Sequence, residues 1–226
     1  MQSKENTEKQ IEFLTDFVTA ERLDKINNII EKRTKYLTVV LEDIYHPHNA
    51  SAVIRTCECF GIQDMYTIEN VKQHRVNKCV TQGAGKWVTL NRYANAANNT
   101  ENCVRHLKKK GYKIVATSLR EGVSVPPEEL PVDNKLALCF GTEELGLSDT
   151  LHDMADYFVK IPMVGFTQSF NISVSAALIL QVLTGKLRNS DIGWKLNCKE
   201  KQDIRLNWIK NSIRNVDAIL KRIERC

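Results

Sequence analysis

The sequence lacks any long hydrophobic run and any apolar leader at its beginning. No stretch of its 226 residues reaches about 18 uninterrupted apolar positions, so we expect no membrane-spanning helix. The first ten residues, MQSKENTEKQ, have no apolar core of the kind found in secretion signals. In the absence of such a signal, the seven cysteines are expected to be reduced thiols. We therefore expect a cytoplasmic protein.

Several motifs of common enzyme classes are missing or incomplete. Residues 83–86, GAGK, lack the spacing of a nucleotide-phosphate loop and the Ser or Thr that follows its lysine. No GxGxxG follows the first predicted strand, which disfavours a nicotinamide-dependent dehydrogenase, and no GxSxG elbow is present. Cys57 and Cys59 have no second close pair, and His46 and His48 have no third ligand nearby in the sequence. We therefore expect no metal site.

The positive charge of the chain is concentrated in its last segment. Residues 186–226 carry 11 Lys and Arg against 5 Asp and Glu, whereas residues 1–185 carry 21 against 22. A basic segment of this kind indicates a polyanionic partner, of which nucleic acid is the commonest. A solvated helix face is the alternative interpretation, and charge alone does not decide between them.

The hydrophobic pattern predicts strands that alternate with helices. Runs rich in apolar and β-branched residues predict strands at 37–44, 64–70, 112–118, 135–141 and 156–162. Helical spacing and end signals predict helices at 48–61, 101–111 and 173–185. This alternation is typical of an α/β fold with a mostly parallel sheet and helices on both faces.

Helical extensions are predicted on both sides of this core. The first 36 residues have apolar positions at spacings of three and four, and Thr19 has the character of a helix start. From residue 199 on, a single last helix is predicted, with one apolar face formed by Ile209, Ile213, Val216, Leu220 and Ile223. The chain is therefore divided into a helical extension at 1–36, a central domain at 37–185 and a basic helical extension at 186–226.

Polar residues follow four of the predicted strands. Asn49 and Arg55 follow the first strand, and Thr117 and Ser118 end a middle one; polar loops at 140–148 (FGTEELGLS) and 165–173 (GFTQSFNIS) follow the last two. Ligands of parallel sheets bind beyond the carboxyl ends of the strands. Taken singly, Asn49 and Ser173 could be helix caps and Gly146 a turn residue. Four such segments at one edge nevertheless predict a binding site.

Three segments resemble, in order, the motifs of the SpoU/TrmH branch of the SPOUT RNA methyltransferases. The first is NASAVIRT, in which Arg55 follows Asn49 after five residues. The second, FGTEELGL, matches the pattern FGxExxGL throughout. The third, IPMVGFTQSFNISVSA, departs from its pattern only at Phe170, where Leu is usual. The segment QGAGKWV at 82–88 is also similar to a Lys-Trp loop of the family. The resemblance covers about residues 37–185.

The resemblance implies a deep C-terminal trefoil knot, the cofactor S-adenosyl-L-methionine and methyl transfer to a ribose 2′-oxygen of RNA. It places around the cofactor Thr117, Ser118, Phe140, Gly141, Thr142, Ile161, Met163, Gln168, Ser169, Phe170 and Asn171. It gives catalytic or substrate-side roles to Arg55, Asn49, Glu143, Ser169 and Asn171. The role of Arg55 stays open, because a guanidinium with a pKa above about 12 is a poor base and better stabilises a developing alkoxide. Ser173 is expected to cap the following helix.

The resemblance also implies an RNA substrate and a second subunit. The short N-terminal segment and the basic C-terminal one favour tRNA, with guanosine 18 of the D-loop as the target. The alternatives are another tRNA or ribosomal RNA nucleotide, or an RNA-binding relative without catalysis. Candidate phosphate contacts are Lys86, Lys186, Arg188, Lys195, Lys199, Lys201 and Arg205. Trp194 and Trp208 could stack on bases, and for Trp208 core packing is the alternative. Family members pair through knot-side helices, and the apolar helix at 173–185 is compatible with a homodimer.

Overall fold

The computed structural model describes residues 2–44, 46–71, 83–118 and 124–223. The chain forms two compact units, of which the larger spans residues 34–194 and the smaller combines residues 1–33 with 195–226. Residue 82, the first of the segment compared with the family's Lys-Trp loop, lies outside the described residues.

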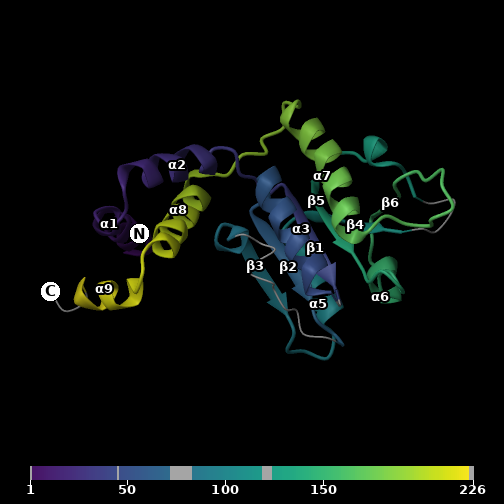
Figure 1. The fold of residues 1–226 in the computed structure, drawn as a ribbon, viewed down its shortest axis with the longest axis horizontal. Helices are drawn as coiled ribbons and strands as arrows, with labels where there is room; N and C mark the ends of the chain where they lie inside the picture. Colours follow the sequence, from purple (N-terminus) through teal and green to yellow (C-terminus); the bar gives the residue numbers. More distant parts are fainter. Residues whose placement is uncertain (1, 45, 72–82, 119–123, 224–226) are drawn as a thin grey trace. The chain divides into compact units, whose positions relative to one another are not determined.

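A six-stranded parallel sheet forms the centre of the larger unit. Its strand order is β3-β2-β1-β5-β4-β6, and every described pair of neighbours is parallel (Figure 1). The strands are β1 (Leu37–Glu42), β2 (Asp64–Ile68), β3 (Thr89–Tyr93), β4 (Tyr112–Thr117), β5 (Lys135–Phe140) and β6 (Tyr157–Val159). The predicted α/β class is confirmed. The sequence pattern does not reveal β3, because an edge strand with the mixed sequence TLNRY is only half-buried.

Helices cover both faces of this sheet. On one face lie α3 (Pro47–Phe60) and α7 (Ile172–Arg188), and on the other α5 (Asn99–Lys109) and α6 (Asp149–Asp153) (Figure 1). Short 3₁₀ turns lie at η1 (Ala84–Lys86) and η2 (Pro127–Glu129). Successive residues of β1 serve the two cores in turn: Val39 packs with the α3 and α7 side, and Val40 with the α5 side.

The helix ends correct two of the expected caps. Gly61 ends α3 with φ +79°, as predicted, in the left-handed conformation that suits glycine. Asn49, however, is the third residue of α3, whose N-cap is His46, so its side chain is free for another contact. Ser173 does not cap α7. The cap is Asn171, whose Oδ1 accepts hydrogen bonds from the backbone N of Ser173 at 2.9 Å and from its Oγ at 2.6 Å.

The smaller unit joins the two ends of the chain. It contains α1 (Gln2–Thr15), α2 (Ala20–Ile30), α8 (Cys198–Ser212) and α9 (Val216–Ile223). Thr19 caps α2 as predicted, accepting the backbone N of Arg22 at 3.3 Å. Helices α1 and α2 pack against α8, and the buried side chains of this unit include Leu14, Ile26, Ile30, Ile204 and Trp208.

The prediction of one continuous last helix is wrong. The chain leaves the helical conformation at Ile213, with φ −103° and ψ 131°, and Asn215 has φ +56°. Asparagine tolerates the left-handed region better than most residues, so a break at this position is inexpensive. Among the described helices, none has the length and apolarity needed to cross a membrane.

Candidate active site

A cavity of about 500 Å³ opens at the carboxyl ends of β4, β5 and β6, beside the start of α7. This is the edge at which parallel sheets bind ligands. Ten of the eleven residues expected around a cofactor line it: Thr117, Ser118, Phe140, Gly141, Thr142, Ile161, Met163, Gln168, Ser169 and Phe170. The exception is Asn171, which is turned toward Glu143 and Asn49 instead.

The loop at 141–147 forms one wall of this cavity and is closed on itself. Thr142 and Gly146 exchange two backbone hydrogen bonds, of 2.9 and 3.0 Å. A Cβ added at Gly141 would lie 2.1 Å from the carbonyl carbon and oxygen of Gly146, so only glycine fits there. Gly146 itself has φ +71°, which also favours glycine. The two glycines of FGTEELGL thus permit a tight loop that presents Glu143, Glu144 and Leu145 to the cavity.

The three sequence motifs meet at the carboxylate of Glu143. Its Oε1 accepts the side-chain amide of Asn49 at 2.7 Å and that of Asn171 at 2.9 Å. The Asn171 amide also lies 3.2 Å from Oδ1 of Asn49. Since both amides donate to one carboxylate oxygen, their orientations are fixed. The structure therefore assembles, at the rim of the cavity, three of the five predicted catalytic residues, and Ser169 lines the cavity beside them.

Arg55 stands apart from this cluster. It lies six residues beyond Asn49 on α3, which corresponds to about 9 Å along a helix axis. Its side chain is exposed and makes no hydrogen bond or ion pair within the described part of the chain. It lines neither the main cavity nor a smaller one of about 30 Å³ beside Asn49 and Glu143. A single chain thus does not bring Arg55 to the cofactor cavity.

Several ionisable residues of the cavity wall were not identified from the sequence. They are Glu144, Asp149, His152 and Lys160. The ring of His152 is stacked on Phe158, its Nδ1 lies 3.1 Å from the Ser148 carbonyl oxygen, and its Nε2 lies 3.3 Å from Ser118 Oγ. The sequence signal that could have located this region is Ser148 followed by an acidic residue, a pattern that indicates the start of a helix. Within the described residues, no group of three or more His, Cys, Asp or Glu is arranged to hold a metal.

Comparison with known proteins decides the family. A model described as the SpoU rRNA Methylase family matches residues 36–181, well over half of the chain. The chain belongs to this family. The tRNA (guanosine(18)-2'-O)-methyltransferase of Borreliella burgdorferi is 44% identical over 211 residues, which cover 93% of this chain and 94% of the relative.

Solved structures agree with this assignment. The crystal structure of the TrmH/SpoU tRNA modifying enzyme of Aquifex aeolicus superposes with a TM-score of 0.77 at 30% identity, covering 86% of this chain and 98% of that one. The SpoU methyltransferase AviRb of Streptomyces viridochromogenes, in complex with AdoMet, has a TM-score of 0.60 at 22% identity and covers 72% and 65%. The resemblance inferred from the three motifs is confirmed.

The Lys and Arg residues expected to bind RNA differ in the contacts they already make within this SpoU-family chain and in their exposure. Lys186 donates to the carbonyl oxygens of Glu128 and Leu130, both at 2.6 Å, and Arg188 donates to that of Phe60 at 2.8 Å. In the smaller unit, Lys201 forms an ion pair with Glu31 at 2.7 Å, and Arg205 is half-buried. The exposed members of the set are Lys86, Arg188, Lys195 and Lys199.

The two tryptophans considered for base stacking are both packed in the protein. Trp208 is 2% exposed and lies beneath the guanidinium of Arg33, 5.0 Å from its ring centre. Trp194 is half-buried against the core on the α3 and α7 side of the sheet. The core interpretation therefore holds for Trp208, whose rings are not accessible to a base.

Proposed function

We propose that this SpoU-family chain transfers a methyl group from S-adenosyl-L-methionine to the ribose 2′-oxygen of guanosine 18 in the D-loop of tRNA. The observation that carries the proposal is the 44% identity, over nearly the whole of both chains, to the B. burgdorferi protein of that name. The family description mentions rRNA, but that relative and the A. aeolicus structure are both named as tRNA enzymes. A tRNA substrate implies work in the cytoplasm.

The cavity fits a cofactor of this size and charge. Its volume of about 500 Å³ lies within the ~300–1,000 Å³ typical of small-molecule sites. Three carboxylates line it against one lysine, which suits a ligand with positive charges. When bound, S-adenosyl-L-methionine supplies a methyl group activated by its positively charged sulfur. The apolar lining available to pack on an adenine includes Phe140, Ile161, Met163 and Phe170.

We assign to Glu143 the role of the general base that removes the proton of the 2′-hydroxyl. Its Oε1 is held by Asn49 and Asn171, and its Oε2 accepts no hydrogen bond within the described part of the chain. The side chain is exposed at the cavity wall, where an incoming ribose can reach it. The carboxylate accepts a hydrogen bond from the hydroxyl and takes the proton as the oxygen gains its new bond. The two asparagines keep that carboxylate in place, so the reacting oxygen is aligned before transfer.

Arg55 acts by charge in this scheme. A guanidinium stays protonated, so it neither takes nor returns the proton and instead stabilises negative charge on the ribose oxygen or a neighbouring phosphate. Because Arg55 does not line the cavity of its own chain, it acts from the RNA side, or from a second copy of the protein.

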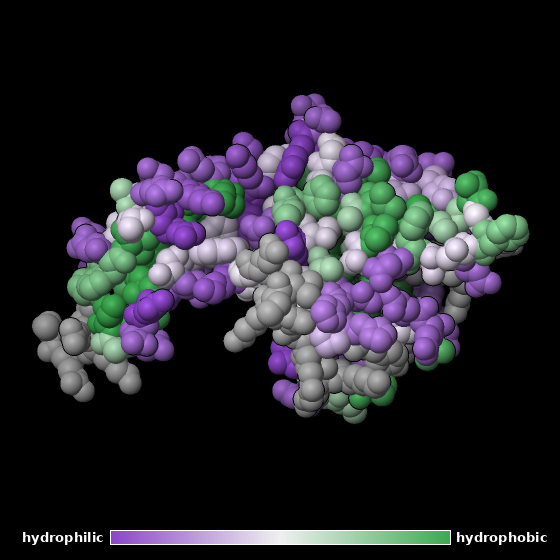
Figure 2. All heavy atoms as spheres, in the orientation of Figure 1, coloured by the Kyte–Doolittle hydropathy of each residue, from purple (hydrophilic) through white to green (hydrophobic). Residues whose placement is uncertain are grey.

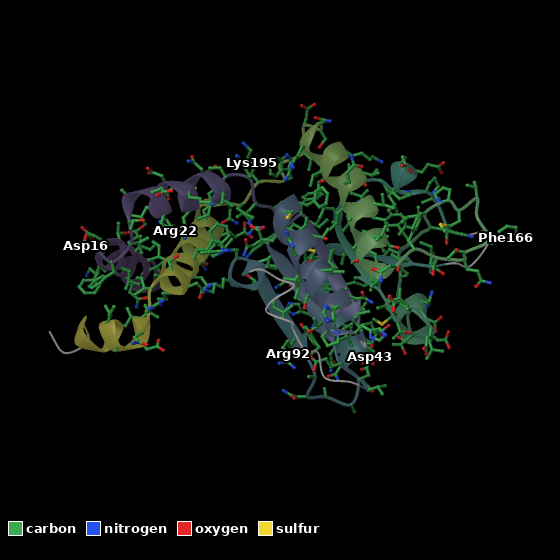
Figure 3. The ribbon with its side chains drawn as sticks, viewed as in Figure 1. Asp16, Arg22, Asp43, Arg92, Phe166 and Lys195 are labelled. Carbon is green, nitrogen blue, oxygen red and sulfur yellow. The ribbon has the colours of Figure 1, made fainter. Side chains whose placement is uncertain are left out.

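A homodimer is part of the proposal, and the surface of α7 supports it. Val174 and Leu178, one turn apart on α7, are each 42% exposed, and Val164 and Phe166 in the preceding loop are fully exposed. Figure 2 shows apolar side chains gathered over α7 and this loop, and Figure 3 shows Phe166 extending from the loop into solvent. A symmetric partner would cover this surface.

The trefoil knot also belongs to the proposal. The segment after β4 returns alongside β6: Val125 donates to the Phe158 carbonyl at 3.0 Å, and Lys160 donates to the Val125 carbonyl at 3.0 Å. The chain therefore leaves β4 and β6 at the same, carboxyl-terminal edge of the sheet, where the implied threading would take place.

The test is methyl transfer to defined RNA. Purified protein is incubated with radiolabelled S-adenosyl-L-methionine and a tRNA, and with the same tRNA carrying 2′-deoxyguanosine at position 18 as the matched control. Label in the first RNA and none in the second is the expected result. Label that persists in the deoxy control, or that appears only in ribosomal RNA, would select another nucleotide. Binding of tRNA with no cofactor binding would select the non-catalytic alternative.

A further inference from the structure

A buried carboxylate lies behind the wall of the cavity. Glu42, the last residue of β1, is 2% exposed, and within the described residues it forms no ion pair. Its oxygens accept three hydrogen bonds: from Thr100 Oγ1 at 2.6 Å, from Ser148 Oγ at 2.8 Å and from Ser148 N at 2.8 Å. A buried carboxylate is tolerated only when such donors satisfy it. Two of the three come from Ser148, so Glu42 and Ser148 fix each other's positions.

Ser148 connects this carboxylate to the cavity wall. It follows the loop 141–147 directly and begins α6, where its Oγ accepts the backbone N of Leu151 at 3.2 Å while donating to Glu42. Its carbonyl oxygen accepts the backbone N of His152 at 3.0 Å and lies 3.1 Å from Nδ1 of the same ring. The end of the loop and the orientation of His152 therefore both depend on Ser148.

The hydrogen bonds of His152 determine which of its nitrogens carries a hydrogen. A carbonyl oxygen can only accept, so Nδ1 must donate to Ser148, and in the neutral ring Nε2 is then an acceptor. Nε2 lies 3.3 Å from Ser118 Oγ, so the Ser118 hydroxyl donates to it. Stacking on Phe158 holds the ring plane. Ser118 directly follows β4 and lines the cavity, so the hydrogen bonds that start at Glu42 reach both the 141–147 loop and the end of β4.

We propose that Glu42 is a positioning residue for cofactor binding, acting through Ser148 and His152 on the loop 141–147 and on Ser118. The inference rests on the proposed function, because it assumes that S-adenosyl-L-methionine occupies this cavity. Glu42 touches no reacting atom. Its effect is on the affinity for the cofactor and not on the chemical step, because Ser148 holds only the end of the loop, whereas Asn49 and Asn171 hold the Glu143 carboxylate.

The first test measures cofactor affinity by calorimetry in Glu42→Gln and in His152→Asn. In Glu42→Gln, the new side-chain NH₂ group faces one of the three donors that the carboxylate accepted. One of the three hydrogen bonds is therefore lost. His152→Asn keeps an amide hydrogen at the Nδ1 position and loses the acceptor for Ser118. We expect the Kd for S-adenosyl-L-methionine to rise about tenfold in the first variant and about fivefold in the second, each the size of one lost hydrogen bond. The KM for tRNA and the kcat at saturating cofactor should stay within about twofold of wild type.

Glu69→Gln is the matched control. Glu69 is also a buried carboxylate, 6% exposed, but it pairs with Arg92 of β3, and neither of these two residues lines the cavity. It should lower the melting temperature without changing cofactor affinity. If Glu42→Gln also lowers the melting temperature and leaves the Kd within about twofold of wild type, Glu42 is merely structural and the proposal is wrong.

The second test needs no cofactor. Nitrogen NMR of the histidine rings in the free protein should show the neutral His152 ring with its hydrogen on Nδ1, and a mixture of tautomers in Glu42→Gln. A hydrogen on Nε2 in the wild type would overturn the path from Glu42 to Ser118. If the wild type binds no S-adenosyl-L-methionine at all, the proposed function fails by itself, and the tautomer still shows whether Glu42 orients His152.

Discussion

The side-chain amide of Asn171 donates to Oε1 of Glu143 at 2.9 Å, across 28 residues of sequence. Asn49, 94 residues before Glu143, donates to the same oxygen at 2.7 Å. One atom thus joins the start of α3, the loop after β5 and the start of α7. Because three separate motifs converge on it, the orientation of this carboxylate is determined by the fold and not by local sequence.

Glu143→Gln should lower kcat by about 100-fold or more, which is the usual size of a general-base contribution. The neighbouring Glu144 also lines the cavity but is hydrogen-bonded to neither asparagine. Glu144→Gln should therefore raise the Kd for the cofactor and leave kcat nearly unchanged. Single-turnover methyl transfer with saturating cofactor separates the two effects. Equal loss of kcat in both variants would remove Glu143 from its assigned role.

Arg55→Ala should lose nearly all methyl transfer while its cofactor affinity stays that of the wild type, since Arg55 does not line the cavity. Arg55→Lys should fail as well, because an ammonium lacks the planar fork of the guanidinium. Arg105→Ala, which removes an exposed arginine paired with Glu101 on α5, is the control and should be fully active. If Arg55→Ala keeps more than about a tenth of the wild-type kcat, a loss below about 1.4 kcal/mol, the catalytic assignment is wrong.

How far the sequence predicts this site depends on the range of the interactions concerned. Phe140, Gly141 and Thr142 follow a buried strand, so the rule for parallel sheets places them at the correct edge. The two glycines of the 141–147 loop could be recognised as turn residues, but that Gly141 excludes a side chain depends on the approach of Gly146 in space. Five of the six strands follow from periodicity, and the resemblance supplied the residues of the third motif.

The remainder could not be predicted, because it depends on contacts distant in sequence. His152 lies on a helix of five residues whose only sequence signal is its capping serine. From its position in the sequence, Asn49 is expected to cap a helix, yet its side-chain amide donates to Glu143. The residue that caps α7 is Asn171 and not Ser173. Glu42 reads as one more residue of β1, and only the folded chain brings Thr100 and Ser148 to it.

Lys199→Gln should make tRNA binding less sensitive to salt. Lys199 is exposed near the start of α8, and each neutralised phosphate contributes about 0.7–0.9 to the slope of log K against log salt. The slope should therefore become shallower by about that amount, with cofactor affinity unchanged. Lys109→Gln, at an exposed lysine on α5, is the control. Equal slopes for Lys199→Gln and the wild type would exclude this lysine from the RNA contact.

A point substitution is preferable to removing residues 190–226. The truncation would take away α8 with Ile204 and Trp208, against which α1 and α2 pack, and would expose Leu14, Ile26 and Ile30. A loss of tRNA binding would then have two causes. Lys201→Gln gives a graded comparison, because Lys201 is already paired with Glu31 at 2.7 Å and should contribute less to the salt slope than Lys199.

Leu178→Glu should convert a dimer to a monomer and lower activity with it. Leu178 is 42% exposed on α7, one turn from the equally exposed Val174, and a charge there would have to be buried without a partner if α7 forms the interface. Val71→Glu places the same charge at an apolar residue that is 75% exposed elsewhere in the larger unit, so it should change neither assembly nor activity. Sedimentation at micromolar concentration, with methyl transfer measured on the same samples, checks both. Activity should fall in step with dimer content, because the cavity of one chain lacks its own Arg55. A wild-type protein that sediments as a monomer with full activity would rule the dimer out and would leave Arg55 to act from the RNA side alone.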